Sequence, residues 1–522
     1  MPVAERGGDV VLGADIGTTG ARGVVFDPSG RQLHATSADY PLHSPHPGWA
    51  EQDPAQVLEA ITRCVREAAA WSTEQGLRPR ALGLSAILHS LIPLDAAGEA
   101  LAPTMIWADT RASGEADQMR LEIDPLALYA RVGGPVHPMY CSAKIRWLRR
   151  KRPDVFRRTA TFAGIKEYVL HRWTGQLVCD RSVASGTGLY NGREGRWDDE
   201  ALAVSGIDVR QLPPVIETTE TVRASAAQLR ALGLPEDCAI VAGGGDGVLQ
   251  TIGSGTVSPG QMVAMVATSG AIRSVVDSFQ TDAHARTWCY YLAAGKWVVG
   301  AAINNAGIVY AWLRDQLSHG LSAGEAGAVE IEQLNAWASE IAPGSSGLVF
   351  LPYLAGERSP GWNANARGLL FGLSLAHDYR HLARATLEGV AYRMRTIFEP
   401  MQEVAGAAHE IRAAGGFIRS PLWLQIVADV LGRPLRLVDS PEASALGAAQ
   451  LAMLGTGMVS GFEDLAGMVS PTETVAPDDE RHALYERLFG VYQRLYGKVQ
   501  DDFAEISRLQ SELAARGPAS GR

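Results

Sequence analysis

Short apolar runs separated by turns dominate the first part of the chain. A segment with apolar residues at helical spacing follows them, beginning at Asp53, a favourable N-cap that precedes proline, and stopping at Gly76. The pattern predicts an antiparallel meander, a helix and a further strand, which together begin an α/β domain. The predicted strands are Val10–Ala14, Ala21–Asp27, Arg31–Ala38 and, after the helix, Ala81–Ser85.

The loop GTTG, Gly17–Gly20, joins the first two predicted strands and lies just after Asp15. Glycines let a ligand approach the backbone closely, N–H groups at a tight turn favour an anion, and threonine hydroxyls add donors. Asp15 would repel a bare phosphate, so a phosphate site here requires a divalent cation such as Mg²⁺ between the two. The alternative is a glycine-rich hairpin with a surface aspartate.

The same scheme recurs about half a chain later. Val263–Asp277 has an apolar strand, a short polar turn and a second apolar strand, and its ATSGA at Ala267–Ala271 parallels GTTGA at Gly17–Ala21. Repetition at this scale predicts two similar domains, each with a phosphate-binding hairpin. Chance similarity of two hairpins is the alternative.

A third glycine-rich segment, GGGDG at Gly243–Gly247, follows an apolar run at Cys238–Ala242. We expect the run to form a strand, the glycines a tight exit, and Asp246 to begin a short helix, whose positive end keeps a carboxylate ionised. An ionised carboxylate beside a phosphate site is what a general base for a hydroxyl requires. Val248 stands where GxGxxG needs its last glycine, and GxxxxGK[ST] is absent, which argues against Rossmann and P-loop sites.

Composition narrows the function classes. The 522 residues are enough for two or more domains. A net charge of −10 argues against a nucleic-acid partner. The five cysteines form no CxxC pair, so we expect neither disulfides nor a zinc site, and a cytoplasmic setting fits best. No apolar run approaches the roughly 20 residues that span a bilayer, and MPVAERGGDV lacks the core of a signal peptide, so no membrane partner is expected.

Three later segments, together with the paired hairpins and GGGDG, resemble the FGGY carbohydrate kinases of the actin-like ATPase superfamily. The resemblance implies an α/β fold of two actin-like (ribonuclease H-like) domains with an ATP cleft between them, an N-terminal domain at 1–252 and a C-terminal domain at 253–513. The segments are RGLLFGLSLAHDYRHLARATLEG at Arg367–Gly389, similar to the C-terminal signature, GGFIRSPLWLQIVADVLGRPL at Gly415–Leu435, similar to the adenosine-binding segment, and EASALGAAQLA at Glu442–Ala452, similar to the closing helix.

The resemblance also implies residue roles, with ATP and Mg²⁺ as the nucleotide and the metal. Asp246 would take the proton from the sugar hydroxyl that attacks the γ-phosphoryl group, and Asp15 would hold Mg²⁺ through water. Phosphoryl transfer depends mainly on positioning and charge neutralisation, which such a set provides. The residues expected to bind ATP are Thr18, Thr19, Arg22, Thr268, Ser269, Gly307, Gly415, Gly416 and Ser420, and those expected at the sugar are His89, Trp107, Asp109, Lys144 and Asp246.

Several of these residues also have structural interpretations. His89 could be a satisfied core histidine, Asp109 could form only an ion pair with Arg111, and Lys144 could cap or pair locally. Phe417 follows Gly415-Gly416 where the family commonly has glycine, which affects the expected adenine contacts.

Segments such as LPYLAGERSPGWNANARG resemble the gluconate kinase branch more than the xylulose or glycerol branches. The resemblance implies direct in-line transfer to a sugar acid, D-gluconate giving 6-phosphogluconate. The alternatives are a xylulose, ribulose or other polyol kinase, a catalytically silent sugar sensor on this fold, and an actin-like or chaperone-type ATPase. Because the net charge is negative, an anionic substrate needs a local cation, and the candidates are Lys144, Lys166 and Arg181.

The end of the chain is less informative. Apolar residues at helical spacing predict a terminal helix over Tyr485–Leu513 that packs on the second domain. The small, polar residues 514–522 are expected to be disordered. The oligomeric state is not readable from the sequence, and a homodimer is left open.

Overall fold

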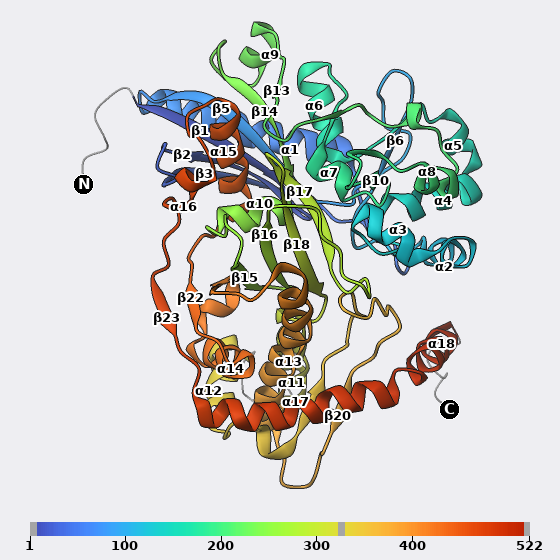
Figure 1. Cartoon of the computed structure of the whole chain (residues 1–522), viewed down its shortest axis with the longest axis vertical. Coiled ribbons are helices and arrows are strands. Elements are labelled where there is room, and N and C mark those ends of the chain that lie inside the picture. Colours follow the sequence, from blue (N-terminus) through green and yellow to red (C-terminus); the bar gives the residue numbers. More distant parts are fainter. Residues whose placement is uncertain (1–7, 322–328, 516–522) are drawn as a thin grey trace. The chain divides into compact units, whose positions relative to one another are not determined.

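The computed structural model describes residues 8–321 and 329–515. The chain forms two compact units (Figure 1). The predicted domain limits, 1–252 and 253–513, stay a prediction, and the compact units differ from them because unit 1 includes two later segments. Unit 1 comprises Met1–Pro259, Ser274–Val299 and Ser440–Ser470, and unit 2 comprises Gly260–Arg273, Gly300–Asp439 and Pro471–Arg522.

Unit 1 is a mixture of strands and helices. Its strands are β1 (Asp9–Ile16), β2 (Gly20–Phe26), β3 (Gln32–Asp39), β4 (Glu51–Gln52), β5 (Arg78–Ala86), β6 (Ile92–Leu94), β7 (Thr104–Met105), β8 (Thr161–Ala163), β9 (Cys179–Asp180), β10 (Tyr190–Asn191), β11 (Arg196–Trp197), β12 (Val215–Ile216), β13 (Thr221–Val222), β14 (Ala239–Gly245) and β17 (Trp288–Ala293). Its helices are α1 (Pro54–Glu74), α2 (Ser113–Glu122), α3 (Pro125–Val132), α4 (Cys141–Lys151), α5 (Pro153–Arg158), α6 (Ile165–Thr174), α7 (Arg181–Ser185), α8 (Asp199–Ser205), η1 (Val209–Gln211), α9 (Ala226–Ala231), α10 (Asp246–Gly253), α15 (Ala443–Gly455) and α16 (Phe462–Ala466).

Longer helices characterise unit 2, and the chain passes between the units within β16 (Gly270–Val276) and β18 (Lys296–Ile303). The other strands of unit 2 are β15 (Gln261–Val266), β19 (Val349–Leu351), β20 (Leu369–Phe371), β21 (Glu410–Ala414), β22 (Leu435–Leu437) and β23 (Glu473–Val475). Its helices are α11 (Gly307–Leu321), α12 (Ile331–Ser339), η2 (Ser345–Gly347), α13 (Tyr379–Ala405), η3 (Gly416–Arg419), α14 (Pro421–Leu431), α17 (Asp479–Val499) and α18 (Asp502–Ala515).

The main sheet of unit 1 has the strand order β13-β14-β5-β1-β2-β3. β1 pairs antiparallel with β2, and β2 with β3, which confirms the predicted meander. β5 lies parallel to β1 on one side and to β14 on the other. The carboxyl ends of β1, β5 and β14 therefore meet at one edge of the sheet.

Two helices cover opposite faces of this sheet, and glycines allow both to approach closely. A Cβ on Gly13 of β1 would lie 2.0 Å from the carbonyl oxygen of Ala445 in α15, and one on Gly83 of β5 would lie 2.0 Å from that of Ala448. On the other face, a Cβ on Gly23 of β2 would lie 2.6 Å from the carbonyl oxygen of Cys64 in α1. Figure 1 shows α15 lying against β1 and β5. A segment from late in the chain thus completes the core of unit 1.

The glycines before Asp246 lie inside β14, and the prediction that they form an exit turn after the strand was wrong. Gly243 has φ +71, and the pairing of β14 with β5 shifts register between Val241 and Gly244. A Cβ on Gly243 would lie 1.7 Å from the carbonyl oxygen of Leu84. A bulge of this kind needs glycine because only glycine adopts this φ without strain and leaves room for the neighbouring strand.

Unit 2 contains β15 and the first residues of β16, which together form the second predicted hairpin. β15 pairs parallel with β21, which pairs with β22, and β22 pairs with β23. The terminal helix predicted over 485–513 is two helices, α17 and α18, separated at Gln500 and Asp501, so this prediction was wrong in its continuity. Ala514 and Ala515 of the predicted tail belong to α18, and residues 516–522 lie outside the described residues.

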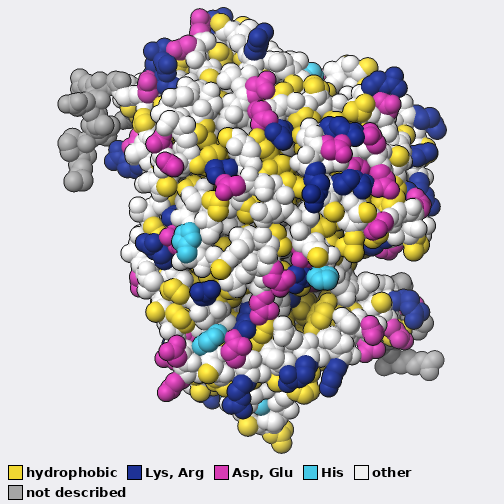
Figure 2. Space-filling view, viewed as in Figure 1, with side chains coloured by type: hydrophobic (Ala, Val, Ile, Leu, Met, Phe, Trp, Pro, Cys, Tyr) yellow, Lys and Arg dark blue, Asp and Glu magenta, His cyan; other side chains and the backbone are white. Residues whose placement is uncertain are grey.

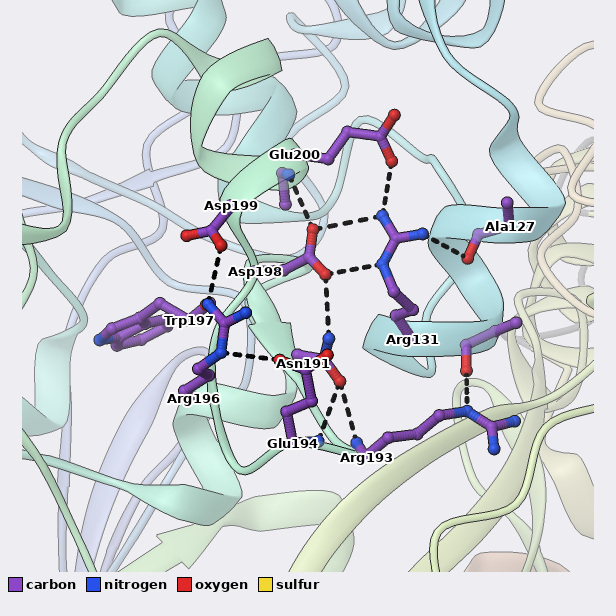
Figure 3. A network of polar contacts seen from close by, with 12 residues as sticks. Ala127, Arg131, Asn191, Arg193, Glu194, Arg196, Trp197, Asp198, Asp199 and Glu200 are labelled. Carbon is purple, nitrogen blue, oxygen red and sulfur yellow. Dashed lines mark hydrogen bonds and ion pairs between the residues drawn. The ribbon is translucent and has the colours of Figure 1, made fainter.

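A polar network stabilises the part of unit 1 around α3 and α8 (Figure 3). Arg131 of α3 donates from Nε to Asp198 Oδ2 at 2.8 Å, and Asn191 of β10 donates to the same oxygen at 3.2 Å. Asp198 also caps α8 by accepting from the N–H of Ala201. This cluster joins a helix, a hairpin and a helix start.

Charges of both signs are interspersed over the face shown in Figure 2. All five cysteines are free and buried. Among residues 8–321 and 329–515, no helix is long and apolar enough to cross a membrane.

Candidate active site

Two aspartates and a serine lie at the edge where β1, β5 and β14 end. Asp15 of β1 is the register partner of Ser85 in β5, and Gly244 in β14 pairs with the same serine. Asp246 follows β14 directly as the first residue of α10. The structure therefore brings the predicted metal ligand and the predicted general base to one edge of one sheet.

Asp15 is in an environment that disfavours its charged form. Burial raises the pKa of Asp15 to about 7, and the negative charges of Asp246 and Glu442 act in the same direction. Its Oδ1 is buried and accepts no hydrogen bond from the described residues. A buried carboxylate oxygen of this kind fits a cation ligand.

The small number of protein ligands near Asp15 is compatible with Mg²⁺, the metal that the sequence predicts here. In the described parts of the chain, no group of three or more His, Cys, Asp or Glu side chains could hold a metal ion. Mg²⁺ usually binds one or two carboxylates and completes its octahedron with water and substrate phosphates. Asp15 is therefore suited to Mg²⁺ bound together with a nucleotide.

Asp246 is held as an acceptor by the start of its own helix. Its Oδ1 accepts from the N–H of Gly247 at 2.7 Å and from that of Leu88 at 3.4 Å. Its place in the first turn of α10 puts the carboxylate at the positive end of the helix dipole, which favours the ionised form. This confirms that Asp246 begins a helix, and its role as a base stays a prediction.

Each carbonyl oxygen of the first loop accepts a hydrogen bond from Tyr40 or Gln52. Tyr40 donates from its hydroxyl to Gly17 at 2.7 Å and to Gly20 at 3.0 Å, and its N–H donates to Thr19. Gln52 donates from Nε2 to Thr18 at 2.7 Å. No described residue accepts a hydrogen bond from the N–H of Thr18 or Thr19. The loop thus leaves two backbone donors available, and the binding of an anion there stays a prediction.

A cavity of about 490 Å³ lies beside this loop within unit 1. Asp15, Thr18 and Thr19 line it, and so does Arg22, which donates from Nη1 to both oxygens of Glu442 at 2.9 Å. The contact of Arg22 with ATP phosphates stays a prediction, because in this structure its guanidinium is paired with that carboxylate. The full lining is Asp15, Gly17, Thr18, Thr19, Gly20, Ala21, Arg22, Ala35, Thr36, Ser37, Asp39, Gln250, Pro441, Glu442 and Ser444.

The second loop, in unit 2, is supported by a helix. The N–H of Gly307, the first residue of α11, donates to Ala267 at 2.8 Å, and the N–H of Ile308 donates to Thr268 at 3.1 Å. A Cβ on Gly307 would lie 2.4 Å from the Ala267 oxygen, so this contact needs glycine. Thr268 is exposed and Ser269 half-buried, as expected of residues available to a ligand.

The predicted adenosine segment lies at the end of β21. Gly415 has φ +96, and a Cβ there would lie 2.7 Å from the carbonyl oxygen of Val266, the residue before the second loop. Gly416 begins η3 with open space around its Cα. Ser420 caps α14 by accepting from the N–H of Trp423 at 3.3 Å. The structure thus places Gly415 next to the second loop, and the nucleotide contacts of Gly415, Gly416 and Ser420 stay a prediction.

His89 of the predicted sugar site has an unusual backbone. Its φ is +63, a left-handed conformation that is uncommon for residues other than glycine. Its Nδ1 lies 2.6 Å from the carbonyl oxygen of Gly186, and its ring contacts those of Tyr140 and Tyr290 edge-on. Such conformations persist where surrounding contacts impose them, and they are enriched at functional sites.

Lys144, Trp107 and Asp109 make specific internal contacts. Lys144 is fully buried and donates to the carbonyl oxygens of His89 at 2.6 Å and Ile106 at 2.7 Å. Burial lowers the pKa of Lys144 to about 8. Trp107 donates from its indole to Thr18 Oγ1 at 3.1 Å, which links the sugar segment to the first loop. Asp109 is fully buried and pairs with Arg111, so the ion pair considered as an alternative does form.

The two other cations considered for a substrate carboxylate are also engaged. Lys166 is 1% exposed, forms an ion pair with Asp180 and donates to the carbonyl oxygen of Ala242. Arg181 pairs with Glu217 and stacks over Tyr291, with its guanidinium carbon 3.8 Å from the ring centre. Direct contact of either residue with substrate stays a prediction.

Sequence reasoning missed four residues that shape this site. Glu442 and Gln250 line the cavity, and Tyr40 and Gln52 hold the first loop. Glu442 opens a segment whose resemblance to the closing helix was noted, but nothing local indicates that its partner is Arg22. The other three occupy ordinary helix and strand-end positions and carry no motif.

Comparison with known proteins places this geometry in a family. Residues 10–253 match the model of the FGGY family of carbohydrate kinases, N-terminal domain, and residues 264–456 match the C-terminal domain of the same family. A gluconokinase of Bacillus subtilis (strain 168) is 34% identical over 507 residues, 96% of this chain and 98% of the relative.

Two solved structures from Lactobacillus acidophilus are also similar. A gluconate kinase is 30% identical with a TM-score of 0.89, covering 95% of this chain and 99% of that chain. A ligand-bound xylulose kinase is 30% identical with a TM-score of 0.90, covering 95% and 100%. With both family models matched in order and a relative aligned along nearly its whole length, the chain belongs to the FGGY family of carbohydrate kinases and is a phosphotransferase.

Proposed function

We propose that this kinase transfers the γ-phosphoryl group of ATP to D-gluconate, giving 6-phosphogluconate and ADP. The observation that supports gluconate as the substrate is the 34% identity to a gluconokinase along 96% of the chain. The alternative within the family is a xylulose kinase, and the structural similarity to a xylulose kinase favours it as the second candidate.

In the proposed reaction, Asp246 acts as the general base. An oxygen–phosphorus bond forms between the C6 hydroxyl of gluconate and the γ-phosphorus, while the bond from that phosphorus to the β–γ bridging oxygen breaks. Asp246 takes the hydroxyl proton, and ADP leaves with the electrons of the broken bond. A carboxylate at a helix start, where the helix dipole favours negative charge, is suited to accept this proton.

The residues of the first loop are suited to position the nucleotide. Thr18 and Thr19 line the cavity, and Tyr40 and Gln52 hold the carbonyl oxygens of the loop. Asp15 would hold Mg²⁺, which when bound neutralises phosphate charge during transfer. Thr268 and Ser269 offer a second set of donors in unit 2.

The substrate is tested by measuring ADP release with gluconate, D-xylulose, ribulose and glycerol in parallel. We expect the highest kcat/KM with gluconate. A higher value with xylulose would overturn the gluconate proposal and leave the kinase assignment intact. ADP release that no sugar stimulates would favour an ATPase, and the absence of release with sugar binding retained would favour a sensor.

The base is tested by Asp246→Asn, which preserves size but cannot accept the proton. General-base catalysis typically contributes about 10²–10⁴-fold, so we expect kcat to fall by that range while ATP and gluconate still bind. The matched control is Asp208→Asn, which neutralises an aspartate paired with Arg210 on the surface. A variant that kept more than about a tenth of the wild-type rate would exclude Asp246 as the base.

A further inference from the structure

Lys144 is a buried cation whose hydrogen-bond partners are both backbone carbonyls. It lies in the first turns of α4, its side chain is fully buried, and its Nζ donates to His89 and Ile106. Among the described residues, no carboxylate forms an ion pair with it. Buried lysines are costly unless paired and hydrogen-bonded, so packing alone would favour an apolar side chain of the same length.

The two carbonyls belong to the two segments that carry the predicted sugar residues. One is His89 itself, and the other is Ile106, which precedes Trp107 and lies near Asp109 in the chain. A backbone bridge between Leu91 and Met105 already pairs these segments, and the ammonium group of Lys144 binds both of them beyond that bridge. A bridge of two charge-assisted hydrogen bonds fixes their spacing.

The bridge also explains how His89 keeps its left-handed backbone. The carbonyl oxygen of His89 is bound by Lys144, and its ring is held by the carbonyl of Gly186 on the other side. The bridge continues through Trp107, whose indole donates to Thr18 in the first loop. Lys144 and Trp107 together therefore connect the predicted sugar residues with the first loop within unit 1.

We propose that Lys144 is a positioning residue, which fixes the two walls of the sugar site by clamping the carbonyls of His89 and Ile106 and does not itself contact the substrate. This inference rests on the proposed sugar site but not on gluconate as the substrate. It differs from the role that the family resemblance implies, because a clamp serves every sugar that the site accepts, whereas a carboxylate reader serves only a sugar acid.

The test is Lys144→Met, which keeps the length of the side chain and removes its donors, assayed with gluconate and with whichever neutral sugar the enzyme accepts best. Misplacement of reacting groups by about 1 Å can reduce rates by about 100-fold. We expect kcat/KM to fall by about 10- to 100-fold for both acceptors, with the ratio between them unchanged and ATP affinity within about threefold of wild type. A loss confined to gluconate would overturn the clamp in favour of direct recognition.

Hydrogen exchange provides a readout that does not depend on activity. Peptides covering residues 86–92 and 104–111 should exchange faster in Lys144→Met, while peptides of β1 and β5 stay protected. Unchanged exchange in both segments would overturn the proposal. If Lys144→Met does not fold, Lys144→Gln, which retains one amide donor, is measured in the same way.

The matched control is Arg131→Met, which breaks the network of Figure 3. It removes a cation from unit 1 that joins no segment of the site. We expect its kcat/KM to stay within about twofold for all acceptors and its exchange at 86–92 and 104–111 to match wild type. If wild-type enzyme prefers xylulose, the substrate proposal fails, and the clamp is then tested with xylulose.

Discussion

The two hairpin loops have the same length but different supports. Gly17–Thr19 separates β1 from β2, and Ala267–Ser269 separates β15 from β16. The hydroxyl and N–H of Tyr40 and the side chain of Gln52 hold the carbonyls of the first loop, whereas backbone N–H groups at the start of α11 hold those of Ala267 and Thr268 in the second. The same strand–loop–strand hairpin can therefore be held by different supporting contacts in the two units.

The loops also differ in charge. Asp15 lies two residues before Gly17, and the matching position before Ala267 is Met265, which is almost fully buried. Only the first hairpin thus offers a carboxylate to a cation. The comparison predicts that both loops bind phosphate oxygens but that metal dependence resides in the first.

The largest expected effect comes from neutralising Asp15, the carboxylate that distinguishes the first hairpin from the second. Asp15→Asn should lower kcat/KM at least about 100-fold, equivalent to about 3 kcal/mol of transition-state stabilisation. Burial raises the pKa of Asp15 from its ordinary value of 3.8 to about 7. The fold therefore loses stability as the pH rises between these two values, and above about pH 7 the ionised carboxylate keeps it destabilised. The variant should therefore be at least as stable as wild type at pH 8 in urea unfolding.

Met265→Leu is the matched change at the second hairpin. It conserves apolar volume and should alter kcat/KM by less than about threefold. A comparable loss in Met265→Leu and Asp15→Asn would mean that the two positions act alike, contrary to the comparison.

An intermediate effect is expected where the second loop depends on its helix. Gly307→Ala places a Cβ 2.4 Å from the Ala267 oxygen, which must displace the loop. We expect kcat/KM for ATP to fall about 10- to 100-fold. The control is Gly497→Ala in α17, where a Cβ meets nothing within 4 Å and the helix should gain about 0.5–1 kcal/mol. Wild-type kinetics in Gly307→Ala would show that the contact with α11 does not position the second loop.

The smallest effect concerns a single side chain that supports the first loop. Tyr40→Phe removes the hydroxyl that donates to Gly17 and Gly20, two bonds that contribute about 0.5–1.5 kcal/mol each. Because Gln52 still holds the loop, we expect KM for ATP to rise only about 3- to 10-fold, with KM for the sugar unchanged. Tyr310→Phe, which loses a hydroxyl contact with Asn335 in unit 2, is the control. A rise in sugar KM alone would contradict this assignment.

The parts of the site that the sequence predicts are those encoded locally. Both hairpins and the helix that begins at Asp246 follow from short-range patterns of apolar residues, glycine and threonine. The pairing of Arg22 with Glu442 spans 420 positions, and no local pattern specifies it. No sequence pattern specifies the proposed clamp by Lys144 either, because its partners are backbone carbonyls, which every residue has. The bulge in β14 was missed because a run of glycines is equally typical of a turn.

The close packing of α15 against β1 and β5 has a consequence for folding during translation. The sheet emerges from the ribosome early, but the helix that covers Gly13 and Gly83 belongs to residues 443–455 and is synthesised much later. During translation, this face of the sheet remains uncovered, with bare glycine backbone and apolar neighbours exposed to solvent and to chaperones. Unit 1 therefore begins folding first but can be completed only when most of the chain has been made.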